Sequence, residues 1–343
     1  MNSNKKIIIT AIDQRSTVAI VFQTITIGLI MIGSAVGNIG ILLAIYKTKS
    51  LQNKTSIFVA NLAVADLLAG LLIMPFMFIC SIIGDWPFED ASCNLTGTFA
   101  LILGAAGMNT LGAIAYERYC AIVHSMVYHL KITNRLILIV ITFIWLEGLV
   151  LSLCPILGWS EYIYYTNEYL CTVNWAHDVS FTYTIMVVMY FLPLGVMIFC
   201  YASIFKVARR HLRQLAMLDT LSPPSSHNQI VSDSDTQPRI ENSARSLRLK
   251  RDIKAASMLF IVIGTFVLCW TLHGCTMMCL ALGDTCPVDF PEYVYTMTTW
   301  IAMFNSVCNV WIYGMMNRQF RDAFRSLCCI ACLRSSNTQV IQI

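Results

Sequence analysis

The sequence predicts an all-α membrane protein: a bundle of seven transmembrane helices with an amphipathic eighth helix on the cytoplasmic surface. The 343 residues are 57% hydrophobic and only 12% charged, whereas soluble domains carry about 25% charged residues. Seven apolar runs are each long enough for a membrane span, which takes about 20 helical residues. Lys and Arg also concentrate in alternate connections between these runs, as they do in membrane proteins.

The seven runs follow one another along the chain. Four of them contain no ionised residue, and they lie between Arg15 and Lys47, Asp90 and Glu117, Asp178 and Lys206, and Lys254 and Asp284. The runs at 55–83 and 136–160 each contain one acid, and the last run covers 293–317. Soluble core helices are rarely this long, this numerous and apolar on all sides, so we expect membrane spans.

These spans divide the chain into three parts. Residues 1–16 form an extracellular tail, 17–316 form the bundle, and 317–343 form a cytoplasmic helix and tail. Within the bundle, a polar third cytoplasmic loop at about 214–247 is rich in Ser, Asp, Pro and Gln near its middle. That composition predicts disorder.

The charge pattern predicts the orientation, because positive residues stay on the cytoplasmic side. Segments 81–92, 159–179 and 282–292 contain no Lys or Arg but hold nine acids: Asp85, Glu89, Asp90, Glu161, Glu168, Asp178, Asp284, Asp289 and Glu292. We therefore expect a multi-pass plasma-membrane protein with its N-terminus outside and its C-terminus in the cytoplasm. The acids either attract cationic ligands or merely accompany this topology. The net charge of +4 gives no reason to expect nucleic-acid binding.

The eighth helix is predicted from Phe320, Phe324 and Leu327, which recur at helical spacing with arginines between them. Such a helix lies on the inner membrane surface in contact with lipid. Three cysteines follow directly and are suited to acylation by palmitate: Cys328, Cys329 and Cys332.

Two cysteine pairs lie on the predicted outer side, where disulfides persist. Cys93 opens the third span and Cys171 lies in the second outer loop, so we expect a bridge between them. Cys279 and Cys286 flank the third outer loop closely enough for a second bridge, with two free thiols as the alternative.

Glu117-Arg118-Tyr119 ends the third span. An ion pair at this position can hold the protein in one state until the pair is broken. Arg118 can pair with Glu117 or with an acid on another helix, for which Asp252 is the candidate. Breaking such pairs would release Arg118 to meet a partner protein. The alternative is that the pair merely ends a helix at the interface.

Two acids lie inside predicted spans, where a carboxylate needs partners or a proton. Asp66 is expected to meet Asn305 and Asn309, through either a water-mediated network or a bound sodium ion. Glu147 has no role that the sequence suggests.

The chain resembles the rhodopsin-like (class A) G-protein-coupled receptors through an ordered set of motifs: Gly37-Asn38, Asn61 to Asp66, Trp86 before Cys93, Glu117-Arg118-Tyr119, Trp145, Pro193 with Tyr201, Phe266 to Trp270, and Asn309 with Tyr313. The resemblance implies a rotamer switch made of Met108, Pro193, Phe266 and Trp270. It also implies that Arg118, Tyr201 and Tyr313 rearrange to open a G-protein cleft. Met126, a bulky apolar residue in the second inner loop, either inserts into a G-protein pocket or contacts the membrane.

The same resemblance implies a ligand pocket lined by Ala100, Gly104, Trp270, His273, Thr299 and Met303. The expected partners are a heterotrimeric G protein, membrane lipid, an unknown extracellular ligand, arrestin and receptor kinases, with no cofactor and no enzymatic activity.

Several positions depart from the family pattern. Val310, Leu272 and Ser125 replace common prolines, and Gly107 replaces a hydroxyl of the family's sodium site. Ala100 stands where amine receptors of this family carry an aspartate, so a monoamine ligand is not expected. Met303 stands where opsins carry the retinal lysine, which excludes that Schiff base.

Segments such as Cys171 to Trp175 and Met126 to Tyr128 look most like orphan receptors that signal without ligand through the stimulatory G protein. Two alternatives remain open from the residues alone. One is a seven-helix transporter or channel that uses Asp66 and Glu147, and the other is a receptor-like protein that binds without signalling.

Overall fold

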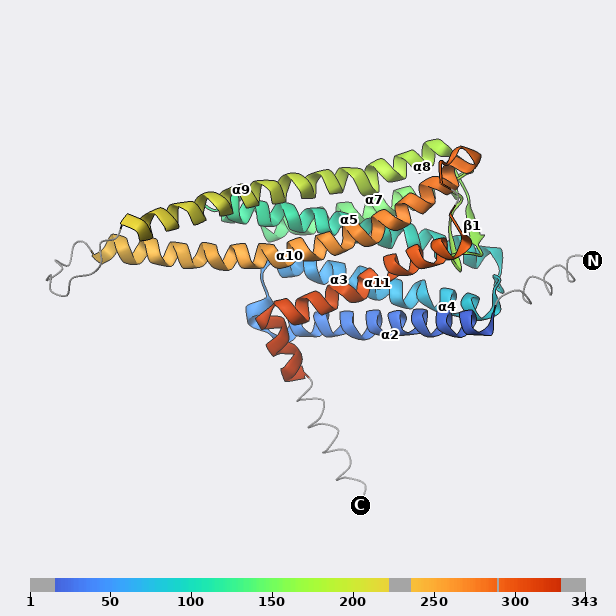
Figure 1. Cartoon of the computed structure of the whole chain (residues 1–343), viewed down its shortest axis with the longest axis horizontal. Coiled ribbons are helices and arrows are strands. Elements are labelled where there is room, and N and C mark those ends of the chain that lie inside the picture. Colours follow the sequence, from blue (N-terminus) through green and yellow to red (C-terminus); the bar gives the residue numbers. More distant parts are fainter. Residues whose placement is uncertain (1–15, 222–235, 289, 328–343) are drawn as a thin grey trace, which may run out of the picture.

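The computed structural model describes residues 16–221, 236–288 and 290–327, and it is a bundle of long helices lying side by side (Figure 1). Its helices in chain order are α2 (Thr17–Lys47), α3 (Lys54–Leu72), α4 (Met74–Ile83), α5 (Asp90–Val123), α7 (Asn134–Leu153), α8 (Val179–Ile185), α9 (Leu192–Leu221), α10 (Thr236–Leu282) and α11 (Glu292–Met316). Short elements η1 (Lys49–Leu51), α6 (Tyr128–Lys131) and η3 (Gly283–Thr285) lie in connections.

Six helical segments of the described chain are long and apolar enough to cross a membrane. Two of these segments combine successive elements, α3 with α4 and α8 with α9. Helix α11 packs against α10 and α2 and completes the predicted bundle of seven spans. It is less apolar because it carries buried polar side chains such as Thr299, Asn305 and Asn309.

Side-chain caps fix where several helices begin. The Asn53 side chain accepts the amide of Ser56 at the start of α3, and Thr133 does the same for Leu136 at the start of α7. These oxygens satisfy amides that lack a partner within the first helical turn. The sequence therefore sets these helix starts locally.

Two irregularities interrupt the spans. The second span breaks between α3 and α4, where Pro75 occupies the first turn of α4. A π-helix, η2 (Met186–Phe191), joins α8 to α9 and ends two residues before Pro193. Proline has no amide to donate and π turns often mark functional sites, so a widened turn here re-aims the side chains of this span.

The second outer loop folds as a hairpin over one end of the bundle. Strands β1 (Tyr162–Tyr165) and β2 (Leu170–Val173) pair antiparallel, with Tyr164 opposite Cys171. All four residues of β2 are buried. The hairpin packs closely against α5 at Gly97. A Cβ atom at this position would lie 2.3 Å from the Tyr162 ring, so the absence of a side chain on Gly97 leaves room for the hairpin.

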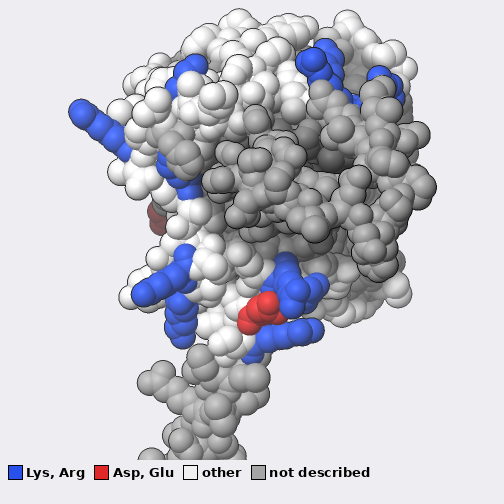
Figure 2. All heavy atoms as spheres, turned by 90° about the vertical axis from the view of Figure 1, so that its left-hand side faces the viewer, with Lys and Arg blue, Asp and Glu red and all other residues white. Residues whose placement is uncertain are grey.

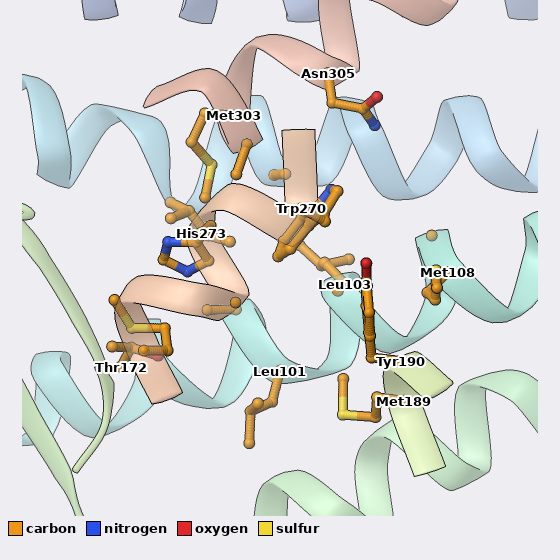
Figure 3. Close-up of a pocket in the computed structure, with 18 of the residues that line it drawn as sticks. Leu101, Leu103, Met108, Thr172, Met189, Tyr190, Trp270, His273, Met303 and Asn305 are labelled. Carbon is orange, nitrogen blue, oxygen red and sulfur yellow. The ribbon is translucent and has the colours of Figure 1, made fainter. Parts of the chain in front are cut away.

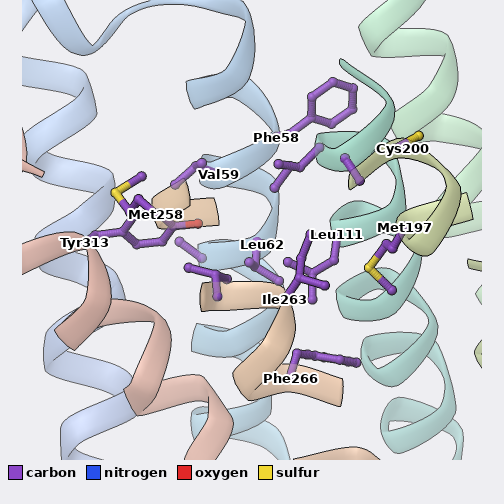
Figure 4. Packing of buried hydrophobic residues seen from close by; sticks show 14 of the residues in the cluster. Phe58, Val59, Leu62, Leu111, Met197, Cys200, Met258, Ile263, Phe266 and Tyr313 are labelled. Atoms are coloured by element: carbon purple, nitrogen blue, oxygen red, sulfur yellow. The ribbon is translucent and has the colours of Figure 1, made fainter. Parts of the chain in front are cut away.

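The main hydrophobic core lies between α3, α5, α9, α10 and α11 and contains Leu62, Leu111, Met197, Ile263 and Tyr313 (Figure 4). Helices α2 and α11 approach each other closely at Gly37. A Cβ atom at this position would lie 2.6 Å from Cγ2 of Val310, so the contact requires glycine. Val310, which replaces a family proline, therefore belongs to the α2–α11 contact.

The helices differ from expectation around the third inner loop. Residues 214–221 and 236–247 were expected to be disordered, but they continue α9 and begin α10. These stretches contain Leu, Ala, Arg and Gln, which favour helix. Residues 222–235, the N-terminal tail to residue 15, and Cys328, Cys329 and Cys332 lie outside the described residues.

A further helix covers residues 318–327 and follows α11 directly. Phe320 is buried against Tyr313, with ring centroids 5.4 Å apart, and Arg318 and Arg325 are exposed. The described chain therefore has the predicted helix after the bundle.

Candidate functional site

Arg118 and Glu117 form a buried ion pair at the end of α5, which we call the Arg118 end of the bundle. Arg118 Nε lies 2.6 Å from Glu117 Oε2, and Arg118 Nη2 lies 2.6 Å from Glu117 Oε1. The Glu117 side chain is only 1% exposed and that of Arg118 is 14% exposed. Two parallel bonds between planar groups hold the arginine firmly in one orientation.

Neighbouring side chains extend this pair into a network. The Thr55 hydroxyl, on α3, donates to Glu117 Oε2 at 3.0 Å and accepts a bond from Arg118 Nη2. The Tyr128 hydroxyl, on α6, donates to Glu117 Oε1. Lys54 Nζ lies 4.8 Å from the centre of the Tyr128 ring and donates to the Ile132 carbonyl. Sequence reasoning missed Thr55 and Tyr128, because no local pattern shows that they meet Glu117.

The surface around this network is basic and carries an exposed methionine. Met126 is 89% exposed in the connection that follows α5. Figure 2 shows Lys and Arg gathered over this end, with few acids visible. Exposed basic residues near these helix ends are Lys47, Lys49, Lys131, Arg135, Lys206, Arg209, Arg210, Arg318 and Arg325.

The second acid expected to hold Arg118 was Asp252. Its position falls within α10, but its side chain lies outside the described residues, so this pairing stays a prediction. Tyr119, also in the predicted switch, instead shares a 3.1 Å hydrogen bond with His124 Nε2.

Tyr201 and Tyr313 are both buried near this network. Among the described residues, neither hydroxyl has a hydrogen-bond partner. Both side chains belong to the hydrophobic core that also contains Cys120, two residues after Arg118. Two buried donors without acceptors are expected to find partners in another arrangement of the helices.

Asp66 lies in the middle of the bundle, where Asn309 Nδ2 donates to its Oδ2 at 2.8 Å. Asn305 lines the same cavity as Asp66, yet the structure records no hydrogen bond between the two side chains. A separate set of bonds joins Asn61 to Thr110 at 2.7 Å and to Trp145 Nε1 at 2.9 Å. The structure therefore brings together one of the two expected partners.

A cavity of about 150 Å³ opens between α5, η2, α10 and α11, with β2 at its outer end (Figure 3). Phe266 and Trp270 stack at its floor with centroids 5.6 Å apart, and Met108 lines it beside them. Pro193 packs one turn further on, where it lies 3.6 Å from a Cβ atom built on Gly112. Most of the lining is apolar.

Of the six predicted pocket residues, five line this cavity: Ala100, Gly104, Trp270, His273 and Met303. Thr299 does not line the cavity, but its Oγ1 lies 3.4 Å from Nδ1 of the lining residue His273. The sequence did not reveal Met189 and Tyr190 as lining residues, because only the π-helix turns them inward. It also missed Thr172, which β2 supplies.

The turn of the hairpin inserts between α2 and α11. The Tyr169 hydroxyl donates to Gln23 Oε1 at 3.1 Å, and Thr296 Oγ1 donates to the Asn167 carbonyl at 2.5 Å. Between them Glu168 is only 1% exposed. Burial raises the pKa of Glu168 from 4.5 to about 8, although the Thr299 hydroxyl partly offsets this.

Both expected disulfides are present. Cys93 and Cys171 join α5 to β2 with Cα atoms 5.3 Å apart, and Cys279 and Cys286 are bridged with Cα atoms 5.1 Å apart. The first bridge fixes the hairpin above the cavity. The described residues contain no group of three or more metal-binding side chains placed to hold a metal ion.

Glu147, which had no predicted role, lies on α7 and accepts a 3.3 Å hydrogen bond from Asn109 Nδ2 on α5. The pair supplies one polar contact between these helices.

Comparison with known proteins gives consistent results. Residues 37–313 match the 7 transmembrane receptor (rhodopsin family) model. The chain is 32% identical to G-protein coupled receptor 161 of Danio rerio over 90% of the chain and 59% of that protein. It is 30% identical to octopamine receptor beta-2R of Chilo suppressalis over 92% of the chain and 82% of that protein. The first relatives are longer, and the chain spans about 60% of their length.

The fold also matches squid rhodopsin, with a TM-score of 0.75 and 24% identity over 91% of this chain and 86% of that one. The family model covers most of the sequence, and this fold is that of a seven-helix receptor. The chain is therefore a multi-pass membrane protein that belongs to the rhodopsin family of seven-transmembrane receptors.

Proposed function

We propose that this protein couples the cavity above Trp270 to a heterotrimeric G protein at the Arg118 end. The observation that carries the proposal is the Arg118 network, in which Glu117, Thr55 and Tyr128 join three segments at one buried carboxylate. Opening this network would free a guanidinium at a surface that also presents Met126. Such a bistable ion pair is what a switching protein requires.

The proposal includes the orientation of the chain. The receptor lies in the plasma membrane with its Arg118 end facing the cytoplasm. Its N-terminus is extracellular and its C-terminus is cytoplasmic. The basic surface in Figure 2 supports this, because positive residues are retained on the inner side. Acyl chains on Cys328, Cys329 and Cys332 would hold the last helix against lipid.

The proposed signal is basal activation of the stimulatory G protein, with arrestin and receptor kinases as further partners. Support comes from the orphan-like motifs and from the match to relatives named as G-protein coupled receptors.

The decisive experiment measures cyclic AMP and G-protein dissociation in transfected cells without ligand. We expect a basal signal from the wild type that is lost in Arg118→Ala at matched surface expression. Arg135→Ala is the control, because it removes one exposed positive charge from the same end outside the network. The control is expected to keep the basal signal.

Silence of the wild type together with both variants would count against basal coupling. It would favour the alternative of a family member that binds without signalling. The transporter or channel alternative has no support in the family match.

A further inference from the structure

A second cavity lies at the Arg118 end of the bundle, between the ends of α2, α3 and α7. Its volume is about 400 Å³. All three helices and the connection before α3 contribute to its lining, which includes Ile45, Asn53, Lys54, Ile57, Ala60 and Asn134. None of these residues lines the cavity above Trp270. The second cavity is therefore a separate candidate binding site.

The lining of this cavity changes from polar to apolar along α3. Asn53 and Lys54 stand at the start of the helix, and Ile57 and Ala60 follow Lys54 at helical spacing on one face. Lys54 and Ala60 are separated by about 9 Å along the helix axis, at about 1.5 Å per residue. A cavity that is polar at one end and apolar at the other matches the junction of headgroup and acyl chains in a lipid.

Lys54 supplies this cavity with a positive charge that lacks an acidic partner. Its side chain is partly buried, and its Nζ atom donates to the Ile132 carbonyl and lies 4.8 Å from the centre of the Tyr128 ring. The ion pairs within the described part of the chain involve only arginines as cations. An ammonium group can donate three hydrogen bonds, so Lys54 can still bind an anion from the cavity.

The connections around this cavity contain no negative charge that would compete for the lysine. Segments 47–54 and 118–135 hold no Asp or Glu but six positive residues: Lys47, Lys49, Lys54, Arg118, Lys131 and Arg135. Figure 2 shows Lys and Arg gathered over this end of the bundle. Basic pockets between helices on the cytoplasmic side of a membrane bind anionic lipid headgroups, and that leaflet is the one rich in anionic lipid.

We propose that this cavity binds the phosphate headgroup of an anionic lipid, with Lys54 as its ion-pair partner and with Ile57 and Ala60 against the start of the acyl chains. The Asn53 oxygen accepts the Ser56 amide, so the NH2 group of Asn53 is the part that can donate to the phosphate. The apolar wall favours a lipid over a soluble phosphate. Placing the lipid in the cytoplasmic leaflet rests on the proposed orientation of the receptor, whereas binding itself does not.

The test measures thermal unfolding of the purified full-length receptor in detergent micelles as lipid is added. The probe is dioleoylphosphatidic acid, whose headgroup is a bare phosphate. Dioleoylphosphatidylcholine has the same acyl chains but a cationic choline on its phosphate, and glycerol phosphate has the phosphate without acyl chains. We expect saturable stabilisation by phosphatidic acid and a much smaller effect of the other two. Cyclic AMP is not measured, so the outcome is independent of the proposed coupling to a G protein.

Two substitutions alter the cavity in different ways. Lys54→Gln removes its charge, and Ala60→Leu fills its apolar end without changing any charge. Each is expected to weaken binding of phosphatidic acid by about tenfold or more, because the first removes a hydrogen bond between charged groups and the second excludes the acyl chains. Each variant is compared with its own melting temperature without lipid, so a change in intrinsic stability does not obscure the result.

Each substitution has a matched control. Lys49→Gln removes an exposed positive charge from η1, next to the cavity, and Ala202→Leu adds the same bulk at an exposed position of α9. Both controls are expected to bind phosphatidic acid like the wild type. If Lys54→Gln does not fold, the comparison of Ala60→Leu with Ala202→Leu decides alone.

Four results would overturn the inference. The first is no stabilisation of the wild type by phosphatidic acid, and the second is equal stabilisation by phosphatidylcholine, which would remove the role of charge. The third is equal stabilisation by glycerol phosphate, which would make the ligand a soluble phosphate. The fourth is binding that each substitution and its control change equally, which would indicate general attraction of lipid to the surface of the receptor.

Discussion

Two glutamates, Glu117 and Glu168, are equally buried at opposite ends of the bundle, yet their surroundings differ completely. Each is 1% exposed. The Glu117 carboxylate accepts bonds from Arg118, Thr55 and Tyr128, whereas neither carboxylate oxygen of Glu168 has a hydrogen-bond partner within the described residues. The first charge holds helices together, because its desolvation is offset by a cation and two hydroxyls.

An ionised Glu168 carboxylate, in contrast, destabilises the folded protein. Among the described residues no cation offsets the desolvation of Glu168 and the Thr299 hydroxyl offsets it only in part, so the neutral form of Glu168 is favoured. Residue type and burial alone therefore do not decide what a buried acid does. The partners decide it, and the two ends of this receptor can be tested separately on that basis.

The largest effect is expected from Glu117→Ala. Removing one partner of a buried pair costs about 3–5 kcal/mol, because the other charge stays desolvated. We expect a lower melting temperature of the purified receptor and, in cells, a higher basal signal from the released Arg118. Asp322→Ala is the control, since Asp322 forms only an exposed pair 3.8 Å from Arg318. Unchanged melting in Glu117→Ala would refute the importance of the network.

Glu168→Gln should act in the opposite direction. The folded-state pKa of about 8 lies above the ordinary value of 4.5, so the neutral carboxyl stabilises the fold below about pH 4.5 and this contribution is lost as pH rises towards 8. In thermal melts from pH 5 to 8, the wild type should lose stability relative to Glu168→Gln. Glu161→Gln, an exposed site on the same loop, should follow the wild type. Parallel curves for Glu168→Gln and wild type would contradict burial of the charge.

A smaller effect is expected from the packing that places the hairpin. A Cβ atom at Gly97 would lie 2.3 Å from the Tyr162 ring, whereas one at Gly104 would meet nothing closer than 3.9 Å. Overpacking costs about 1–3 kcal/mol, so Gly97→Ala should lower the melting temperature and Gly104→Ala should not. Equal melting of the two variants would show that the hairpin adjusts freely.

Thr55→Val should have the smallest effect. It removes the hydroxyl that joins Glu117 and Arg118 but leaves the ion pair intact. A single hydrogen bond contributes about 1 kcal/mol, so we expect a modest rise in basal signal, well below that of Glu117→Ala. Thr265→Val serves as control because Thr265 bonds only within its own helix, to Ile261. A rise as large as in Glu117→Ala would place the latch at Thr55.

Local sequence patterns predicted much of this molecule. The long apolar runs predicted the spans, and the position of Cys93 and Cys171 on one side predicted the bridge that the structure contains. Phe320 and Phe324 predicted the helix after the bundle. These features depend on residues close in sequence or on the compartment, which composition reveals.

The partners of the buried charges were harder to predict. Thr55 lies 62 residues before Glu117, and no pattern joins them. Met189 and Tyr190 line the cavity from a π-helix, which no sequence pattern indicated. Residues 214–221 and 236–247 are helical although they lie in a stretch whose polar composition predicted disorder.

The sequence by itself determined that the chain spans a membrane in helices, because apolar length alone decides whether a segment can replace water with lipid. It also determined the family, through motifs at fixed order. Only the tertiary structure decided which buried acid is satisfied and which is not. The free energy of a buried charge depends on the atoms within a few ångströms of it, and those atoms come from helices and loops far apart in the sequence.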